Sequence, residues 1–180
     1  MRITTKEITI PISPKPQSRP RSTVVKGRIK VYEDKEAKIY KEAIKIVCKN
    51  RIKEKIQKPN PVSLHIIFYL KNISTKKPDV DNLSKAILDA LNGLLFDDDA
   101  QVIYLVSEKI QSDSESVVIK ILEEKTKKEI IDLGIKKYNS IYDLAEIIGC
   151  SWRTLFRYKN DELGEKSNAL IEAKLKKLFS

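Results

Sequence analysis

An acidic segment at residues 77–102, KPDVDNLSKAILDALNGLLFDDDAQV, restricts the fold of this chain more than any other feature. Apolar residues recur through its middle at the spacing of one helix face, which predicts an amphipathic helix over residues 82–91. Asp81 is a suitable N-cap for this helix, and Asn92-Gly93 is a suitable end. Because the apolar face must be buried, we expect the helix to pack on a sheet, with aspartates at both of its ends.

The surrounding sequence supplies that sheet. Apolar runs of strand length predict strands at residues 3–12, 22–32 (a hairpin that turns at Lys26-Gly27), 62–70, 101–110 and 116–122. The run at 62–70 is apolar enough to be buried on both faces or nearly so. A second helix is predicted behind an Asp34 N-cap and runs to about Ile56. We therefore expect an α+β domain over residues 1–125, with roughly five or six strands and two main helices.

The charge of the chain is uneven. Its 35 Lys and Arg residues outnumber its 25 Asp and Glu residues, which gives a net charge of +10 and a pI of about 9.4. Residues 1–58 carry a net +11 (17 basic against 6 acidic), whereas residues 76–101 carry −3 (3 against 6). Lys41, Lys45 and Lys49 form a basic stripe on the second predicted helix, either solvated or in contact with DNA. Such a chain suits a polyanionic partner, most simply nucleic acid, although a lysine-rich chain also uses its charge merely to stay solvated.

The composition excludes several classes of protein. The single histidine, His65, lies in a strand-like run, so neither a Cys/His zinc set nor a catalytic site with two histidines is available. Cys48 and Cys150 lie far apart in apolar patterns, which favours two reduced, buried side chains. No apolar run approaches the roughly 20 residues of a membrane helix, and the N-terminus alternates like a strand. We expect a cytoplasmic protein with no membrane partner.

The aspartates of the acidic segment fall into two groups. Asp79 and Asp81 flank the predicted helix entrance, and Asp97–Asp99 precede the next strand. Two carboxylates ~4 Å apart repel by about 4 kcal/mol at an effective dielectric near 20, so a converged group would need a cation or a shared proton. Oxygen-only ligands would select Mg²⁺ or Mn²⁺. The sequence leaves open whether the two groups meet or serve only as caps and turn residues.

The sequence pattern of residues 126–180 predicts a separate, small all-α domain that contains a helix-turn-helix. Within SIYDLAEIIGCSWRTLFRYKND, Ala145, Gly149 and Leu155 lie at offsets 0, 4 and 10, where a small residue, a tight turn and a buried aliphatic bring two helices together. The outward side chains of the second helix would include Trp152, Arg153, Phe156 and Arg157. They would enter the major groove if this domain reads DNA. The alternative is a helical hairpin that only packs on the first domain or on a dimer partner.

Three separated blocks of the acidic segment carry a resemblance to a known family. The blocks are Asp79-x-Asp81-Asn82-Leu83-x-Lys85-Ala86, Asp89-Ala90-Leu91-Asn92-Gly93 and Asp98-Asp99-Ala100-Gln101-Val102. In order and spacing they resemble the RusA family of Holliday-junction resolvases. The arm at residues 16–21 is similar to a proline-arginine segment near the family's N-terminus. The resemblance spans residues 1 to about 124 in layout, and the helical segment at 126–180 is an addition to the family's minimal form.

The resemblance implies a small mixed sheet packed with two main helices. It also implies a homodimeric, Mg²⁺-dependent endonuclease, with Mn²⁺ as an alternative cation, that nicks four-way DNA junctions at symmetric positions. By position, the essential carboxylates and metal ligands fall on Asp79, Asp81 and Asp99, and the essential lysine falls on Lys85. Asp98 takes a supporting role, and Asp89 and Asp97 are left structural. DNA phosphates would be held by basic side chains of the arm and of the loop before the helix, namely Lys15, Arg19, Arg21 and Lys77.

Two functions of different kinds therefore compete. One is an endonuclease that resolves four-way junctions. The other is a non-catalytic helix-turn-helix DNA-binding protein or regulator on a degenerate nuclease scaffold. The presence of Asp79, Asp81, Asp99 and Lys85 favours the enzyme, because a DNA binder gains nothing from metal ligands that repel phosphates.

Overall fold

The computed structural model describes residues 2–18, 21–25, 28–32, 34–73 and 78–179. The chain divides into two compact units, one formed by residues 6–121 and the other by residues 122–180 together with residues 1–5. We call them the core unit and the C-terminal unit. Among the described residues, no helix is both long and apolar enough to cross a membrane.

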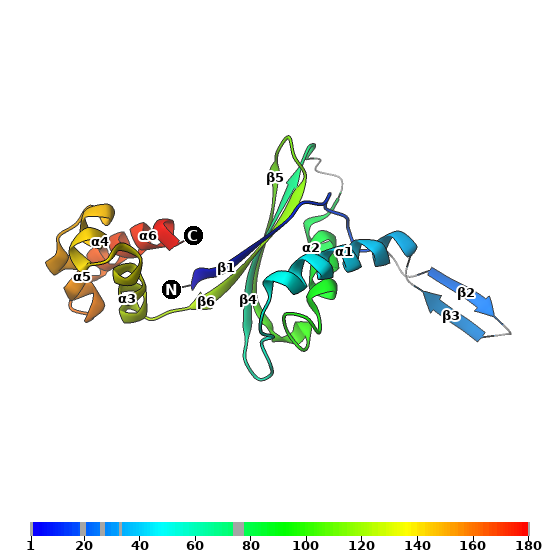
Figure 1. Ribbon diagram of the computed structural model, residues 1–180, viewed down its shortest axis with the longest axis horizontal. Coiled ribbons are helices and arrows are strands. Elements are labelled where there is room, and N and C mark those ends of the chain that lie inside the picture. Colours follow the sequence, from blue (N-terminus) through cyan, green and yellow to red (C-terminus); the bar gives the residue numbers. More distant parts are fainter. Residues whose placement is uncertain (1, 19–20, 26–27, 33, 74–77, 180) are drawn as a thin grey trace. The chain divides into compact units, whose positions relative to one another are not determined.

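A four-stranded mixed sheet organises the core unit (Figure 1). Its strands are β1 (Arg2–Ile10), β4 (Val62–Leu70), β5 (Val102–Gln111) and β6 (Ser116–Glu124), in the spatial order β1-β6-β4-β5. Strands β4 and β5 are parallel, with Leu64 opposite Leu105 and Ile66 opposite Ser107. A parallel pair needs a long crossover connection, and the acidic segment with its helix provides it. Strand β5 therefore lies at an edge of the sheet, directly beside the strand that precedes the acidic segment.

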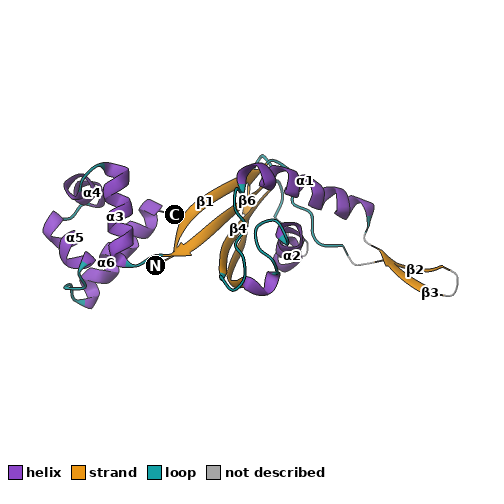
Figure 2. Ribbon diagram, turned by 60° about the horizontal axis from the view of Figure 1, so that its bottom comes forward, coloured by secondary structure: helices purple, strands orange, loops and turns teal. Residues whose placement is uncertain are grey.

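Two helices, α1 (Lys35–Arg51) and α2 (Val80–Leu91), cover one face of this sheet (Figure 2). The core between them and the sheet includes Ile44 and Cys48 from α1, Leu83 and Ile87 from α2, and Phe68 from β4. In β4 the residues facing the helices are buried, whereas Ser63, His65 and Tyr69 on the opposite face are only half-buried. The expectation that this strand is buried on both faces is thus met fully on one face and partly on the other. The predicted α+β fold, with a mixed sheet and two main helices, is confirmed.

The helix boundaries differ from the predicted ones at two places. Helix α2 begins at Val80 and its N-cap is Asp79 rather than Asp81, because the Asp79 carbonyl accepts the first helical hydrogen bond, from Leu83 N (3.1 Å). Asp81 instead lies in the first turn, where a negative charge is favoured by the helix dipole. Helix α1 ends at Arg51 rather than near Ile56, because Ile56 N donates to Leu95 O (2.8 Å) and so ties this segment to the residues that follow α2.

A two-stranded antiparallel hairpin precedes α1. It consists of β2 (Arg21–Val25) and β3 (Arg28–Tyr32), with Arg21 opposite Tyr32. This confirms the predicted hairpin, whose proposed turn at Lys26-Gly27 lies outside the described residues. Both cysteines are free, as expected; Cys48 is buried, and burial raises the pKa of its thiol to about 11. Cys150 is only half-buried.

The C-terminal unit consists of four helices and packs around its own apolar cluster. They are α3 (Lys127–Tyr138), α4 (Ile141–Ile148), α5 (Trp152–Lys159) and α6 (Glu165–Phe179). Hydroxyl side chains cap three of them: Thr126 accepts from Glu129 N, Ser140 from Asp143 N and Ser151 from Thr154 N. Helices α4 and α5 lie where the helix-turn-helix was predicted and are joined by the three residues 149–151. Leu155 and Tyr158 of α5 are fully buried in the cluster.

Gly149 allows the sharp turn between α4 and α5 because its φ of +68° lies in the left-handed region. We predict that Gly149→Ala lowers the free energy of unfolding of the C-terminal unit by about 1–2 kcal/mol, since a Cβ is strained at this φ. The nearest atom to a Cβ there, Lys174 Nζ, is 3.9 Å away, so backbone strain and not a clash causes the loss. Trp152 is the single tryptophan of the chain, and its fluorescence would follow denaturant unfolding of this unit.

Gly164→Ala is the matched control, because Gly164 has no positive φ and no atom lies within 4 Å of an added Cβ. Gly164 is the N-cap of α6, since its carbonyl accepts from Asn168 N (3.0 Å), and glycine is preferred over alanine there, so we expect a loss of about 0.5 kcal/mol, smaller than that of Gly149→Ala. Equal losses for the two substitutions would contradict the role given to the left-handed turn.

Candidate active site

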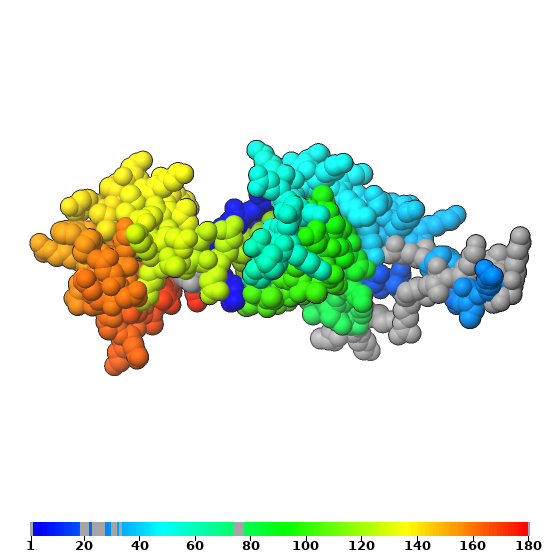
Figure 3. Space-filling view, turned by 90° about the horizontal axis from the view of Figure 1, so that it is seen from below, coloured from blue at the N-terminus to red at the C-terminus, as the bar shows by residue number. Residues whose placement is uncertain are grey.

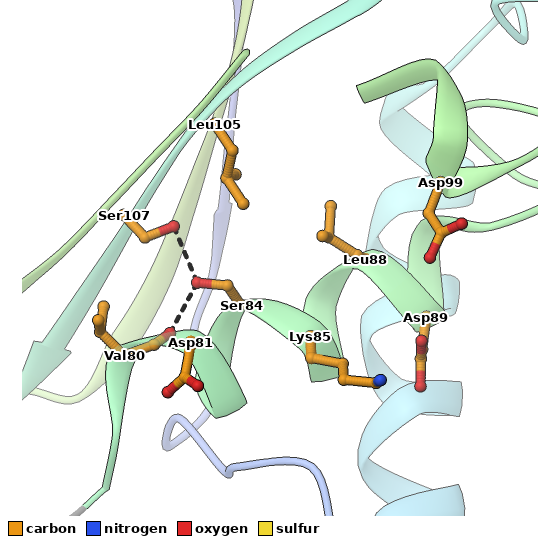
Figure 4. A pocket seen from close by; sticks show the side chains of 9 residues that line it. All are labelled: Val80, Asp81, Ser84, Lys85, Leu88, Asp89, Asp99, Leu105 and Ser107. Atoms are coloured by element: carbon orange, nitrogen blue, oxygen red, sulfur yellow. Dashed lines mark hydrogen bonds between the residues drawn. The ribbon is translucent and has the colours of Figure 1, made fainter. Parts of the chain in front are cut away.

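Helix α2, strand β5 and the turn that precedes β5 enclose a cavity of about 430 Å³ (Figure 4). On the core-unit face drawn in Figure 3, green atoms of the segment that includes α2 and β5 reach the surface. The cavity is lined by Val80, Asp81, Ser84, Lys85, Leu88, Asp89, Asp99, Leu105 and Ser107. Three of the four residues predicted to be catalytic are therefore gathered around one cavity.

The apolar face of α2 determines which of its side chains reach this cavity. Leu83, Ile87 and Leu91 are fully buried against the sheet, so the residues on the other side of the helix face outward. Asp81, Lys85 and Asp89 follow one another at intervals of one helical turn on that outward side (Figure 4). The sequence pattern thus gives the helix one packing face and one face with alternating acidic and basic groups.

A pair of serines fixes α2 on the edge strand. The Ser84 hydroxyl donates to the Val80 carbonyl oxygen (2.7 Å) and is hydrogen-bonded to the Ser107 hydroxyl (2.8 Å) (Figure 4). Ser84 is buried among the apolar residues of the helix, where an unpaired hydroxyl would be costly. The pair was not predicted, but a serine on the apolar face of a helix is a signal that could have indicated a specific partner.

The turn that carries Asp99 is held by a buried glutamine. Gln101 Oε1 accepts from Asp97 N (2.8 Å) and Asp98 N (3.2 Å), and Gln101 Nε2 donates to Ile56 O (3.1 Å) and Asn60 O (2.8 Å). With four bonds to the main chain and 7% exposure, this amide connects the segment after α1 to the end of the acidic segment. Sequence reasoning gave Gln101 no role of its own, because a lone polar residue at the start of a predicted strand does not indicate burial.

The two aspartates before Asp99 in the same turn, Asp97 and Asp98, have their own hydrogen-bond and ion-pair partners. Asp97 pairs with Lys55 (2.6 Å), and Asp98 accepts from Ala100 N (3.0 Å) and pairs with Lys58 (3.0 Å). The hydrogen bonds from Lys55 and from Lys58 N lower the pKa of Asp97, and those from Ala100 N and the Lys58 side chain lower the pKa of Asp98. Both carboxylates are therefore ionised at neutral pH, and neither lines the cavity.

The charged groups of the cavity differ in their partners. Asp89 forms an ion pair with Lys41 of α1 (2.8 Å). Both side chains are largely shielded from water, with exposures of 31% for Asp89 and 13% for Lys41. Within the described part of the chain, neither the Asp81 carboxylate nor the Lys85 ammonium has a hydrogen bond or ion pair. Most other acidic groups of the core unit are paired, so this carboxylate and this ammonium are suited to an external ligand.

Each of the two predicted groups of carboxylates contributes one member to the cavity, and these two do not converge. Figure 4 shows Asp81 at the start of α2, whereas Asp99 points from its turn toward the helical turn of Leu88 and Asp89. Asp79 is the N-cap of α2, accepts a bond from Asn82 Nδ2 (3.4 Å) and does not line the cavity. Among the described residues, no three Asp, Glu, His or Cys side chains form a group that could hold a metal ion by themselves.

Mg²⁺ is nevertheless compatible with this set of donors. All of the acidic ligands offered by the cavity are carboxylate oxygens, which Mg²⁺ prefers. This cation commonly keeps several waters and binds through one or two carboxylates plus the phosphates of its substrate. A site completed by a nucleic-acid phosphate therefore does not require three preassembled carboxylates.

The predicted DNA-binding residues of the core unit lie in the proline-rich arm, at the start of β2 or outside the described residues. Gln17 N donates to Asn82 O (2.9 Å), which holds the proline-rich arm beside the first turn of α2. Lys15 in this arm is half-exposed and pairs with Glu36 (3.4 Å). Arg21 begins strand β2, whereas Arg19 and Lys77 lie outside the described residues.

The basic stripe on α1 is not a uniform solvated surface. Lys41 is shielded by its pair with Asp89, and Lys45 pairs with Glu42 (3.1 Å) on its own helix. Trp152, Arg153 and Arg157, predicted for the second DNA-binding surface, lie together on α5 of the C-terminal unit and are exposed.

Comparisons with known proteins agree with this geometry. The sequence model of the family described as "Endodeoxyribonuclease RusA" matches residues 11–122. The chain is 30% identical over 136 residues to "Uncharacterized protein YqaN" of Bacillus subtilis (strain 168), covering 65% of this chain and 95% of the relative. It is 28% identical over 108 residues to "Crossover junction endodeoxyribonuclease rusA" of Lactococcus phage r1t, covering 55% of this chain and 82% of that protein.

The chain belongs to the RusA family of endodeoxyribonucleases, since the family model matches more than half of it. The resemblance carried by the three blocks of the acidic segment is thereby confirmed. The enzyme class is an endodeoxyribonuclease.

Gln101→Glu tests whether the buried amide positions the turn of Asp99. The substitution keeps the size of the side chain but places a carboxylate against the carbonyl oxygens of Ile56 and Asn60, to which the amide now donates. We predict a loss of about 2 kcal/mol in the free energy of unfolding of the core unit, because two partly buried acceptors lose their donor and face a charge. Urea unfolding followed by circular dichroism would measure it.

Gln111→Glu provides the control, because it makes the same chemical change at an exposed position at the end of β5. It should shift the stability by no more than about 0.5 kcal/mol. If Gln101→Glu is equally mild, the amide does not hold this turn.

Proposed function

We propose that this protein is a Mg²⁺-dependent endonuclease that resolves four-way (Holliday) DNA junctions by paired symmetric nicks from a homodimer. One observation carries the proposal most directly. The Asp81 carboxylate and the Lys85 ammonium, which have no partner among the described residues, share a cavity with Asp99 in a chain of the RusA family. The name of the phage relative, a crossover junction endodeoxyribonuclease, supports the choice of substrate.

The proposed chemistry assigns separate roles to the charged groups. Asp81 and Asp99, with Asp79 at the start of α2, would hold the cation. Bound Mg²⁺ would supply Lewis-acid polarisation of the scissile phosphate and activation of water. The Lys85 ammonium, one helical turn beyond Asp81, would stabilise the negative charge that develops on the phosphate oxygens.

The surroundings of the cavity favour these roles. Leu88 and Leu105 line it with apolar surface, which lowers the local dielectric and strengthens each charge–charge interaction. Lys41 neutralises Asp89, so this third carboxylate adds little repulsion toward a phosphodiester. Asp81 and Asp99 lack such a lysine partner among the described residues, so DNA can approach closely only together with a cation.

The dimer is supported by the edge strand. Ile103 and Tyr104 form a short apolar run on β5, with exposures of 64% and 36%, and the next residue, Leu105, belongs to the cavity wall. An apolar run on an exposed sheet edge is a site of association, and a second copy would cover it. A C2 dimer would present two equivalent cavities to a junction that has two-fold symmetry itself. The cytoplasmic location expected from the sequence remains a prediction.

Asp81→Asn tests the proposed cavity. We predict that it reduces nicking of a labelled four-way junction in Mg²⁺ by roughly 100-fold or more, because the neutral amide is a weak ligand for the cation. Binding of the junction in EDTA should persist or increase, since a negative charge is removed from the DNA-facing side. Nicking on a denaturing gel and binding by anisotropy would measure the two effects separately.

Asp113→Asn is the matched control, as Asp113 is exposed in the loop between β5 and β6. It should nick like the unmodified protein. Full activity of Asp81→Asn would show that the cavity is wrongly assigned even if the enzyme class holds. If the unmodified protein cuts no junction, flap or duplex with Mg²⁺ or Mn²⁺, a non-catalytic DNA-binding role replaces the proposal.

Ile103→Glu tests the edge strand as the dimer contact. We predict that the unmodified protein has the mass of a dimer in sedimentation velocity experiments and that Ile103→Glu shifts it toward the monomer, because a buried, unpaired carboxylate opposes association. Ile39→Glu on α1 is the comparison, since Ile39 is similarly exposed (69% against 64%). If Ile39→Glu dissociates the dimer and Ile103→Glu does not, the dimer contact lies on α1. If the unmodified protein is a monomer, the proposed dimer is excluded.

A further inference from the structure

The C-terminal unit lies outside the match to the nuclease family, which ends at residue 122, and no step of the proposed chemistry uses it. Its helices α4 and α5 are joined by three residues, with Gly149 in the left-handed region and Ser151 as the N-cap of α5. Ala145 (3% exposed) and Leu155 (fully buried) lie between the two helices and the rest of the unit. These features define a rigid two-helix corner of the helix-turn-helix kind.

The outward side of this corner combines aromatic and basic groups. We call it the α5 face and define it by Tyr142, Trp152, Arg153, Phe156 and Arg157. Trp152 and Phe156 keep 37% and 50% of their surface exposed. The Trp152 ring lies 5.6 Å from the Tyr142 ring, and the Arg153 guanidinium lies 5.3 Å from the Trp152 ring. Large aromatic groups that are held by a tilted ring contact but left in water are typical of a binding surface.

The charges of the α5 face identify the kind of partner. Helix α5 contains Arg153, Arg157 and Lys159 and no acidic residue. Lys159 is paired with Asp132 (2.6 Å), and Arg157 donates to Glu162 O (3.0 Å), which restrains its guanidinium. Arg153 has no anionic partner among the described residues, and its guanidinium lies over the Trp152 ring. The face therefore presents a cation that is oriented by an aromatic ring and is available to an anion.

We propose that the α5 face binds double-stranded DNA, with α5 inserted in the major groove. An α-helix fits this groove, and the second helix of a helix-turn-helix pair enters it with its N-terminal residues toward the bases. Arg153, in the first turn of α5, suits the acceptor edge of guanine, and Phe156, one turn further, suits a thymine methyl group. The protein thus has a second DNA-binding surface, for ordinary duplex, in addition to its nuclease cavity.

This binding requires no metal ion and no cleavage, so its test is separate from that of the proposed function. The full-length protein would be titrated in EDTA with a fluorescein-labelled linear duplex of mixed sequence. Trp152 is the single tryptophan of the chain, so its intrinsic fluorescence reports on the α5 face without any label on the protein. We expect duplex to reduce the quenching of Trp152 by acrylamide over the same concentration range in which the anisotropy of the duplex rises.

Two outcomes of this titration would overturn the proposal. Duplex binding that leaves the acrylamide quenching of Trp152 unchanged would place the contact elsewhere. Protection of Trp152 that grows with protein concentration in the absence of DNA would show that a second copy of the chain covers the face instead.

Substitutions give an independent measurement. Arg153→Glu should weaken linear-duplex binding by about tenfold or more, because it removes a base-contacting cation and adds a repelled charge. Lys128→Glu makes the same charge change on α3, at an exposed lysine outside the helix-turn-helix, and should weaken it far less. Phe156→Ala should lower affinity with little change in the salt dependence, since it removes an apolar contact. Equal effects of Arg153→Glu and Lys128→Glu, with helix content unchanged, would overturn insertion of α5.

Discussion

The packing of α2 on the sheet is the interaction on which the candidate active site depends. Leu83, Ile87 and Leu91 are fully buried against the strands, and burial of such side chains stabilises a fold by roughly 1.5–3 kcal/mol each. Because a helix has 3.6 residues per turn, this burial forces Asp81 and Lys85 to the opposite side. The Ser84–Ser107 hydrogen bond then fixes α2 on the edge strand. The site is therefore a direct consequence of how one helix is docked.

The other side of the cavity depends on a polar interaction instead. Asp99 reaches the cavity from a turn whose main chain is bound by the buried Gln101 amide, and its neighbours Asp97 and Asp98 are occupied by lysines. The protein thus separates acidic residues that stabilise its structure from those left for a ligand. This separation explains how a chain with a net charge of +10 maintains a local acidic site. In the proposed function, the basic remainder would attract the DNA, and the acidic cavity would make its close approach dependent on a cation.

Local sequence patterns were sufficient for most of the secondary structure. The apolar spacing indicated helix α2 and strand β4, and Asn92-Gly93 indicated where α2 ends. The offsets between Ala145, Gly149 and Leu155 indicated the corner formed by α4 and α5. The blocks around Asp79 and Asp99 indicated the family, which the comparisons confirm. The N-cap of α2 was placed wrongly, at Asp81. Both aspartates are good caps, and the choice depends on which carbonyl accepts the first helical hydrogen bond.

The sequence by itself determined most of the elements and the family, and it supplied the residues proposed to carry the chemistry, because helix and strand periodicity and spacing along the chain are local properties. Only the tertiary structure decided which of these residues meet. The parallel register of β4 and β5 brings α2 over Leu105 and Ser107, places Asp81 and Asp99 on one cavity without joining them, and leaves Asp79 off its wall. The packing of α1 beside α2 also pairs Lys41 with Asp89. Such pairings join residues far apart in sequence, and they follow from how layers pack, which no local pattern contains.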